Sequence, residues 1–281
     1  MEKKVELDES QEKVGGSIIA CAATAAFAGY THQEAVEKIA AGISEPSLGL
    51  VSAGKIQLCP QNRSTLGLEE CSFLVAAYPG TEFRVHANTS CGGKFGLHDA
   101  SSDWGSGAFK EWKSMLKIAC ALLGAPAYSW HAGRSDRANL SQAIARTLDL
   151  EQELGIPVGV EGLYPSEATG WLMSSFEDYR TVMGSGARYA IDLSHWQIIA
   201  RKEGRLELGL LEDLLTHPRC LEIHVSDNDG KRDNHRPLAR KTFWIDLVSK
   251  LQQQQLLAAD VFSEGLQASK RSTESGLSKL Y

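Results

Sequence analysis

The sequence predicts an α/β protein whose fold is a closed (β/α)8 barrel, the TIM-barrel architecture. Eight short apolar runs, many of them β-branched or aromatic, each end at a polar or turn residue, as buried strands do. Segments of helix length lie between these runs, and strands separated by helices pair in parallel. Eight strands within about 250 residues fit a closed barrel better than an open sheet.

The expected strands cover, in order, residues 17–23, 55–60, 83–88, 127–133, 157–164, 188–195, 220–227 and 260–265. The clearest helices are expected at 32–42, 109–124, 140–155 and 243–257. In the third of these, Leu140, Ile144 and Leu148 recur every four residues, which predicts an apolar stripe that Ala143, Leu150 and Leu154 widen. Gly155 is expected to end that helix.

Composition and length indicate one globular domain. The chain has 281 residues, of which 43% are hydrophobic and 23% charged. We expect a single catalytic domain over 15–266, between a polar N-terminal tail at 1–14 and a polar C-terminal tail at 267–281. No apolar run approaches the ~20 residues of a membrane span, and the charged N-terminus lacks the core of a secretory signal. The six cysteines show no regular spacing, which favours reduced thiols and a cytoplasmic location.

The carboxyl ends of the predicted strands are rich in metal-binding residue types. In this fold those ends form the active face. Carboxylates and imidazoles that converge there are costly unless a cation joins them, so the pattern predicts a divalent metal ion. Imidazole and carboxylate ligands without a thiolate suit Mn²⁺, Co²⁺, Zn²⁺, Fe²⁺ or Mg²⁺. In chain order the candidates are His86, His131, Glu161, Asp192, His195, His224, Asp227, Asp229, Asp233, His235 and Glu264.

Strand alternation predicts where two of these side chains point. In the run LEIHVSD, Leu221, Ile223 and Val225 alternate with His224, so the imidazole faces away from the apolar side chains. Apolar residues suit the side of a barrel strand that faces the helices, which turns His224 toward the barrel axis. The same reasoning turns Glu161 inward.

For several single residues, a structural role is an alternative to the functional interpretation. A lone His86 fits a hydrogen-bonded core histidine, and Asp227, Asp229 and Asp233 fit turn formers in a glycine-containing loop. Trp130 and Trp196, which adjoin proposed ligands, either wall the pocket or pack against the helices. Six consecutive strand ends that each carry a ligand type nevertheless favour a metal site.

The stretches AIDLSHW (190–196) and EIHVSDNDGKRDNHRPL (222–238) resemble the xylose isomerase-like TIM-barrel superfamily. The resemblance spans the third to the eighth predicted strand. Its most specific part is the ordered set of a D-x-x-H step and an H-x-x-D step, with one Glu before and one after. The superfamily contains sugar and sugar-phosphate isomerases and epimerases, and also AP endonucleases of family 2, the endonuclease IV type.

The isomerase branch implies one divalent ion that binds two adjacent substrate oxygens. Its ligands would be Glu161, Asp192, His224 and Glu264. Glu161 and Glu264 would act on opposite faces of a small sugar, polyol or sugar phosphate, as paired acid and base through an enediolate-like intermediate. The expected substrate-binding residues are His195, Arg232, Trp196, Asp227 and His131.

The endonuclease branch implies nine ligands for three zinc ions and supports an alternative, a multinuclear zinc phosphodiester hydrolase. All nine types have a match: His86, His131, Glu161, Asp192, His195, His224, Asp233, His235 and Glu264. Two observations speak against a nucleic-acid partner: the net charge is −6, and the loops lack large Lys/Arg clusters, with Arg134 and Arg137 forming a close pair that suits a sugar phosphate equally well. We therefore expect a carbohydrate partner. Three points stay open: whether the protein forms a homo-oligomer, whether it resembles a third branch that oxidises peptides with iron, and whether the barrel is catalytic at all.

Overall fold

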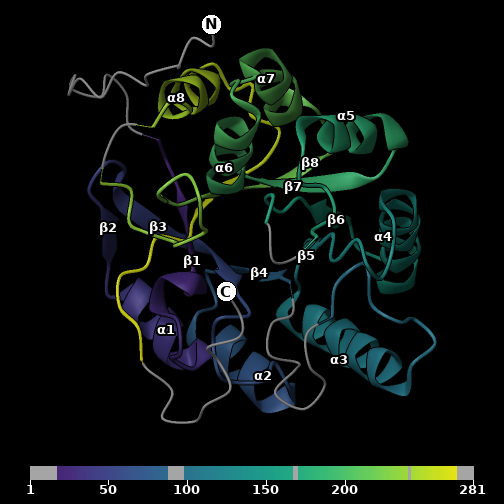
Figure 1. The fold of residues 1–281 in the computed structure, drawn as a ribbon. Helices are drawn as coiled ribbons and strands as arrows, with labels where there is room; N and C mark the ends of the chain where they lie inside the picture. Colours follow the sequence, from purple (N-terminus) through teal and green to yellow (C-terminus); the bar gives the residue numbers. More distant parts are fainter. Residues whose placement is uncertain (1–17, 88–97, 167–169, 240–241, 271–281) are drawn as a thin grey trace, which may run out of the picture.

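The computed structural model describes residues 18–87, 98–166, 170–239 and 242–270, and within them a closed ring of parallel strands (Figure 1). Strand β1 pairs in parallel with both β3 and β9, which closes the ring, and every other neighbour in the ring is also parallel. This confirms the predicted (β/α)8 barrel. The eight strands of the ring are β1 (Cys21–Ala23), β3 (Gly49–Leu58), β4 (Glu82–His86), β5 (Tyr128–His131), β6 (Val158–Glu161), β7 (Arg188–Asp192), β8 (Cys220–Val225) and β9 (Val261–Ser263).

A further strand, β2 (Ile43–Glu45), forms an antiparallel hairpin with the first part of β3 and lies outside the ring. This strand was not predicted, because three residues are too few to show a period of two. Its last residue, Glu45, is buried, and it accepts hydrogen bonds from the main-chain N–H of Leu238 and from the hydroxyl of Ser263. The hairpin thereby joins the loop after β8 to the end of β9.

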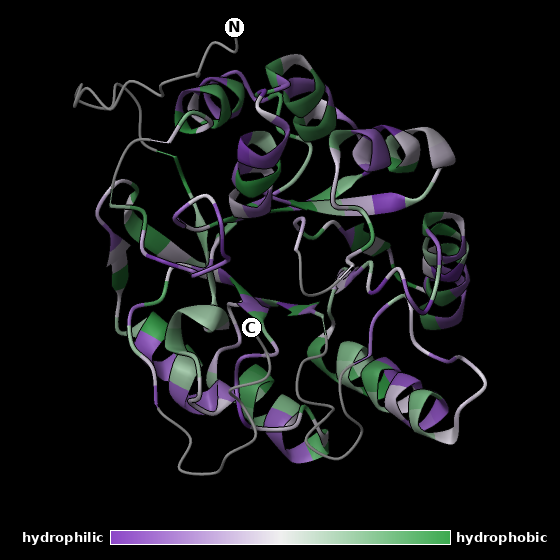
Figure 2. Ribbon diagram, in the orientation of Figure 1, coloured by the Kyte–Doolittle hydropathy of each residue, from purple (hydrophilic) through white to green (hydrophobic). Residues whose placement is uncertain are grey.

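Helices surround the barrel (Figure 1). The four helices predicted most clearly are present as α1, α3, α4 and α8. Figure 2 shows that α3 and α4 each carry both hydrophobic and hydrophilic residues, as helices with one buried side do. In order, the helical segments are η1 (Thr24–Phe27), α1 (His32–Ala40), α2 (Leu68–Ala77), α3 (Gly107–Leu123), α4 (Leu140–Leu154), α5 (Phe176–Ser185), α6 (Leu193–Glu203), α7 (Leu208–Thr216) and α8 (Ile245–Gln253).

Local signals explain several helix ends. Thr31, Asn139 and Ser175 each form a capping box with the residue three positions on. Gly155 ends α4 in the left-handed conformation with φ 72°, as predicted. Of the predicted stripe of α4, Ala143 and Leu150 are buried, together with Thr147, whereas Leu140, Ile144 and Leu148 are only partly buried.

Several predicted strands were too long, and the sixth shows a physical reason. The run at 188–195 is extended only as far as Asp192, whose Oδ1 accepts the main-chain N–H groups of Ser194 (2.6 Å) and His195 (3.3 Å). This carboxylate is the N-cap of α6, so the chain turns into a helix immediately after the strand. His195 therefore lies in the first turn of α6.

The core lies between the ring and the helices. Val158, Val160, Ile223 and Val225 are fully buried in it, which agrees with their predicted direction toward the helices. Of the predicted C-terminal tail, residues 267–270 return to the barrel, where the N–H groups of Gln267 and Lys270 donate to the carbonyls of Ala26 in η1 and of Ala28 directly after it. The rest of that tail and the predicted tail at 1–14 lie outside the described residues. Within the described ranges, no helix has the length and apolar character needed to cross a bilayer.

Candidate metal centre

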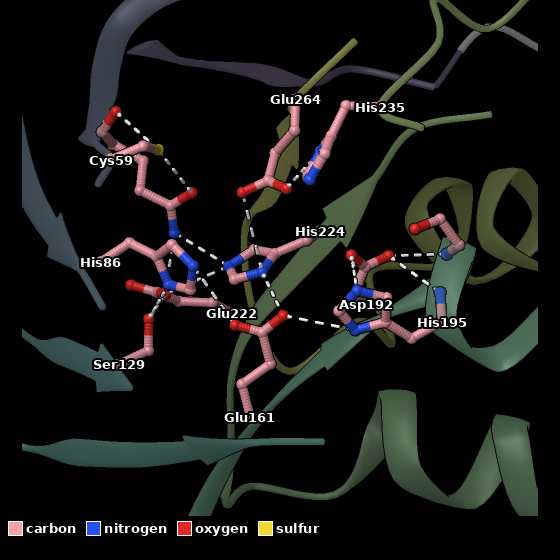
Figure 3. A network of polar contacts seen from close by, with 12 residues as sticks. Cys59, His86, Ser129, Glu161, Asp192, His195, Glu222, His224, His235 and Glu264 are labelled. Atoms are coloured by element: carbon pink, nitrogen blue, oxygen red, sulfur yellow. Dashed lines mark hydrogen bonds and ion pairs between the residues drawn. The ribbon is translucent and has the colours of Figure 1, made fainter. Parts of the chain in front are cut away.

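Parallel pairing brings the predicted ligands to one end of the barrel. Successive strands place them side by side: His131 is in register with Glu161, and Asp192 with His224. The structure joins all nine predicted ligand residues in one cluster of short contacts, most of which Figure 3 shows. They come from the ends of β4 to β9, from the first turn of α6 and from the loop after β8: His86, His131, Glu161, Asp192, His195, His224, Asp233, His235 and Glu264.

Glu161 is the hub of the cluster, and its side chain is 2% exposed. Its Oε2 lies 3.3 Å from Nε2 of His86 and 3.8 Å from Nε2 of His131. Its Oε1 lies 3.5 Å from Nδ1 of His224 and 3.7 Å from Nδ1 of His195. Four imidazoles from three strands and one helix thus face one carboxylate.

A second series of contacts continues from His224. Oε1 of Glu264 lies 4.0 Å from His224 Nδ1, and Oε2 lies 3.3 Å from Nδ1 of His235. His235 Nε2 is 3.0 Å from Oδ2 of Asp233, and the same oxygen is 3.2 Å from Nε2 of His195. The contacts therefore lead from Glu264 back to the side of the cluster that Glu161 occupies.

Exposure shows how the cluster meets solvent. The side chain of His224 is completely buried, whereas that of His131 is 35% exposed and that of His235 is 13% exposed. The floor of the cluster therefore lies at His224, and its most accessible ligand atoms belong to His131.

The protein alone perturbs the protonation of these groups strongly. Burial by itself would lower the pKa of His195, but the carboxylates of Asp192 and Asp233 outweigh burial and raise that pKa to about 10. Glu161 and Glu264 outweigh burial in the same way and raise the pKa of His224 well above its usual value. Without a cation, the buried carboxylates are balanced by protons on imidazoles.

His86 and Asp192 shift in the directions that burial favours. Loss of solvent lowers the pKa of His86 to about 4 and raises the pKa of Asp192 to about 6. For Glu161, burial is the largest influence and acts upward, but the surrounding histidines together hold its pKa well below the usual range.

The cluster fits a divalent cation. Glu161 Oε2, Glu264 Oε1 and His224 Nδ1 are buried and make no hydrogen bond to any described residue, a costly arrangement that a cation would resolve. Two atoms bound to one ion at about 2.0–2.2 Å lie within about 4.4 Å of each other, and the contacts given above are 3.0–4.0 Å long. Sets of three ligand atoms within 4.8 Å of one another include His86, His131 and Glu161, and also Glu161, Asp192 and His195.

A third set, His86, Glu222 and His224, includes Glu222, which was not among the predicted ligands. Glu222 is fully buried and contacts Gln57, Ser129 and His224. The signal for it was present, because Glu222 shares the inward direction of His224 in the alternation of β8. Its partners on β3 and β5 carried no such signal.

The structure also corrects the prediction that Trp196 binds substrate. Its side chain is fully buried against Phe176 and Tyr179, with ring centroids 4.6 and 5.2 Å away. Trp130 likewise packs in the helix layer, stacked at 6.3 Å on Trp112. Both tryptophans therefore pack against the helices, the second of the two alternatives that the sequence left open.

The aspartates of the loop after β8 have different surroundings. Oδ1 of Asp229 accepts the N–H groups of Lys231 and Arg232, so this aspartate forms a turn. Asp227 is buried, its Oδ1 accepts the N–H of Asn228, and its main chain pairs with Arg236. Asp233 joins the cluster instead. The side chain of Arg232 is exposed, and the described residues show no contact between it and the nine ligands.

Comparisons with known proteins identify the fold. No protein-family model and no curated protein matches the chain. Among solved structures, an AP endonuclease of family 2 from Brucella melitensis superposes with a TM-score of 0.61 at 13% identity, over 90% of this chain and 95% of that one. A D-tagatose 3-epimerase-like protein gives 0.59 at 13% identity, over 89% and 92%.

A third solved structure, D-allulose 3-epimerase from Methylomonas sp. in complex with D-allulose, gives a TM-score of 0.56 at 14% identity, over 90% of this chain and 87% of that one. Sequence identities this low show a shared fold but do not show which reaction this protein catalyses. The strand ring, the helices around it and these neighbours agree: this chain has the (β/α)8 TIM-barrel fold that they share.

Proposed function

We propose that this protein is a divalent-metal-dependent isomerase or epimerase of a small sugar, polyol or sugar phosphate. The observation that carries the proposal is the pair Glu161 and Glu264. Both are buried, they come from strand ends on different sides of β8, and one oxygen of each contacts the same atom, Nδ1 of His224, at 3.5 and 4.0 Å. Two carboxylates that face one ion from two directions suit proton transfer on the two faces of a carbon atom.

In this proposal Glu161, Asp192, His224 and Glu264 hold the ion. The ion, when bound, would polarise a carbonyl and an adjacent hydroxyl of the substrate and so acidify the C–H between them. Both glutamates are ready to act as bases, because the histidines around them outweigh burial and keep their pKa values low. One carboxylate would take the proton from carbon, and the other would return a proton to the same or the neighbouring carbon.

The remaining histidines would orient the substrate. His131 is the most exposed member of the cluster, so its ring meets an incoming molecule first. His195 is held by its Nδ1–H, which donates to the carbonyl of Gly162 at 2.9 Å, and its Nε2 faces Asp192 and Asp233. The sugar epimerases among the structural neighbours support a carbohydrate as the substrate class.

One observation favours a second candidate, a multinuclear phosphodiester hydrolase. His86, His131, Asp233 and His235 join the cluster, and a single ion needs no more than about six ligands. The AP endonuclease among the structural neighbours has the same fold. In this second candidate two or three ions would generate and position hydroxide against a phosphodiester.

Metal content and deuterium incorporation separate the two candidates. The purified protein would be analysed for metals and then incubated in ²H₂O with a panel of ketoses, aldoses and their phosphates, with abasic-site DNA assayed in parallel. One ion per chain, with deuterium entering carbon of one sugar, supports the isomerase. Two or three ions with DNA cleavage support the hydrolase. A protein that binds no ion and exchanges no carbon-bound hydrogen would overturn the proposal.

A further inference from the structure

A second layer of polar residues lies beneath the metal centre, on the barrel axis. Its centre is Glu222, which is fully buried on β8 two residues before His224. Its neighbours are Gln57 on β3, Ser129 on β5 and Arg84 on β4 (Figure 3 labels Glu222 and Ser129). A buried carboxylate that is not among the predicted ligands calls for a role of its own.

The hydrogen bonds of Glu222 all run toward it. The Gln57 amide donates to Oε2 at 2.9 Å, and the Ser129 hydroxyl donates to the same oxygen in a short hydrogen bond. The guanidinium of Arg84 lies 3.7 Å from Oε1. An ionised carboxylate accepts hydrogen bonds and donates none. Because the groups around Glu222 are donors, they favour its ionised form, which acts only as an acceptor.

The Ser129 hydroxyl passes this constraint to His86. A hydroxyl has one hydrogen, and in Ser129 that hydrogen is directed to Glu222. The Ser129 oxygen must therefore accept the hydrogen bond from Nδ1 of His86, 2.9 Å away. A neutral imidazole carries a single ring proton, and here it sits on Nδ1.

The consequence appears on the other side of the ring. Nε2 of His86 then carries no proton, and it faces Oε2 of Glu161, an acceptor, across 3.3 Å. Two acceptors at this separation repel each other unless a cation lies against both. The relay from Glu222 thus keeps the ring proton away from the atom of His86 that faces Glu161, as a metal ligand requires.

His224 meets the same carboxylate directly. Its Nε2 lies 3.3 Å from Oε2 of Glu222 and 2.8 Å from Nε2 of Gln57, the amide that also donates to Glu222, while its Nδ1 faces Glu161 and Glu264. A metal-binding histidine commonly has a carboxylate on its outer nitrogen, which fixes the ring and makes the inner nitrogen a better ligand. One glutamate therefore stands behind two of the imidazoles in the cluster.

We propose that Glu222 is a positioning residue of the metal centre, which holds the ring proton of His86 on Nδ1 through Ser129 and orients His224 directly. The inference rests on the proposed metal centre, but its first test needs no metal. The ring nitrogens of histidine give distinct ¹⁵N shifts with and without a proton. In metal-free protein labelled with ¹⁵N-histidine, we expect His86, assigned with H86Q, to carry its proton on Nδ1.

In S129A and in E222Q that preference should be lost, with Nε2 gaining proton occupancy. The matched control is S249A, which removes a buried serine hydroxyl from α8, where it accepts only from the Gln253 side chain among the described contacts. A purely structural role for Ser129 would leave the His86 tautomer unchanged. Wild-type His86 protonated on Nε2 would overturn the proposal.

The second test measures Zn²⁺ affinity by competition with a chromogenic chelator. We expect E222Q and S129A to bind Zn²⁺ about 10–100-fold more weakly than wild type, and S249A to match wild type. Wild-type affinity in both E222Q and S129A would contradict the role of Glu222 while leaving the metal centre in place. If wild type itself bound no Zn²⁺, the proposed function would fail, and the tautomer of His86 would still decide the role of Glu222.

Discussion

Gly162, which follows Glu161 at the end of β6, has no room for a side chain. A Cβ atom there would lie 2.3 Å from the hydroxyl oxygen of Tyr179, 2.5 Å from its Cζ and 2.8 Å from the carbonyl oxygen of Met173. Tyr179 is fully buried, and the Met173 oxygen belongs to the main chain, so neither can move aside easily. The Gly162 carbonyl also anchors His195. We therefore expect G162A to strain both the fold and the metal centre.

The magnitude follows from these contacts. Overpacking a core costs about 1–3 kcal/mol, and three contacts below 3.0 Å place G162A near the upper end, at about 3 kcal/mol. For a domain of this size, about 2–4 °C per kcal/mol corresponds to a fall in Tm of roughly 6–12 °C. Thermal unfolding of the metal-free protein would measure it. The matched control is G184A in α5, where no described atom lies within 4 Å of the added Cβ and alanine favours the helix by about 0.5–1 kcal/mol.

Two results would refute this reasoning. One is a G162A protein as stable as wild type, and the other is a G184A protein that loses as much stability as G162A. The double variant G162A/Y179F adds a test of the mechanism, because it removes the nearest oxygen and leaves Cζ in place. It should recover part of the lost stability, whereas Y179F alone should change little, since that hydroxyl makes no hydrogen bond to a described residue.

Three further predictions concern the centre itself. E264Q should abolish turnover of the sugar found in the panel while circular dichroism shows an intact fold; retained turnover would remove Glu264 from the mechanism. Chelation should lower Tm and added metal should restore it, since an ion at 100 times its Kd stabilises by about 2.7 kcal/mol, and an unchanged Tm would speak against a bound ion. In chelated protein, burial is the largest single influence on the His195 pKa and lowers it, but Asp192 and Asp233 together outweigh burial and raise that pKa from 6.5 to about 10. A raised folded-state pKa adds stability that is complete below pH 6.5 and is lost as the pH rises through about 10. The free energy of unfolding in urea should therefore decline between these pH values, and H195Q should reduce the decline. An equal decline in H195Q would contradict the prediction.

Much of the site could be predicted because the fold itself gathers it. Parallel strands deliver their carboxyl ends to one edge, so residues far apart in sequence, such as His86 and Glu264, could be expected to meet. The alternation within β8 was enough to direct His224 inward. These inferences need only the order of the strands and the alternation of side chains within each strand, and both can be deduced from short stretches of sequence.

What escaped prediction depends on contacts between distant segments. The role of Glu222 requires Ser129 and Gln57 on other strands, whose sequence surroundings are ordinary. Trp196 was misplaced because α6 starts one residue after Asp192. In a helix, successive side chains point about 100° apart, so the neighbour of His195 turns away from the centre and into the helix layer.

Asp192 shows how closely folding and chemistry are tied in this chain. One oxygen of its carboxylate starts a helix, and the other faces the imidazole of His195 at 3.4 Å. Truncation to alanine would therefore confound two losses in a single experiment. Asparagine keeps the oxygen that caps the helix and removes the negative charge, so comparing D192N with D192A would separate the folding role of this side chain from its electrostatic one.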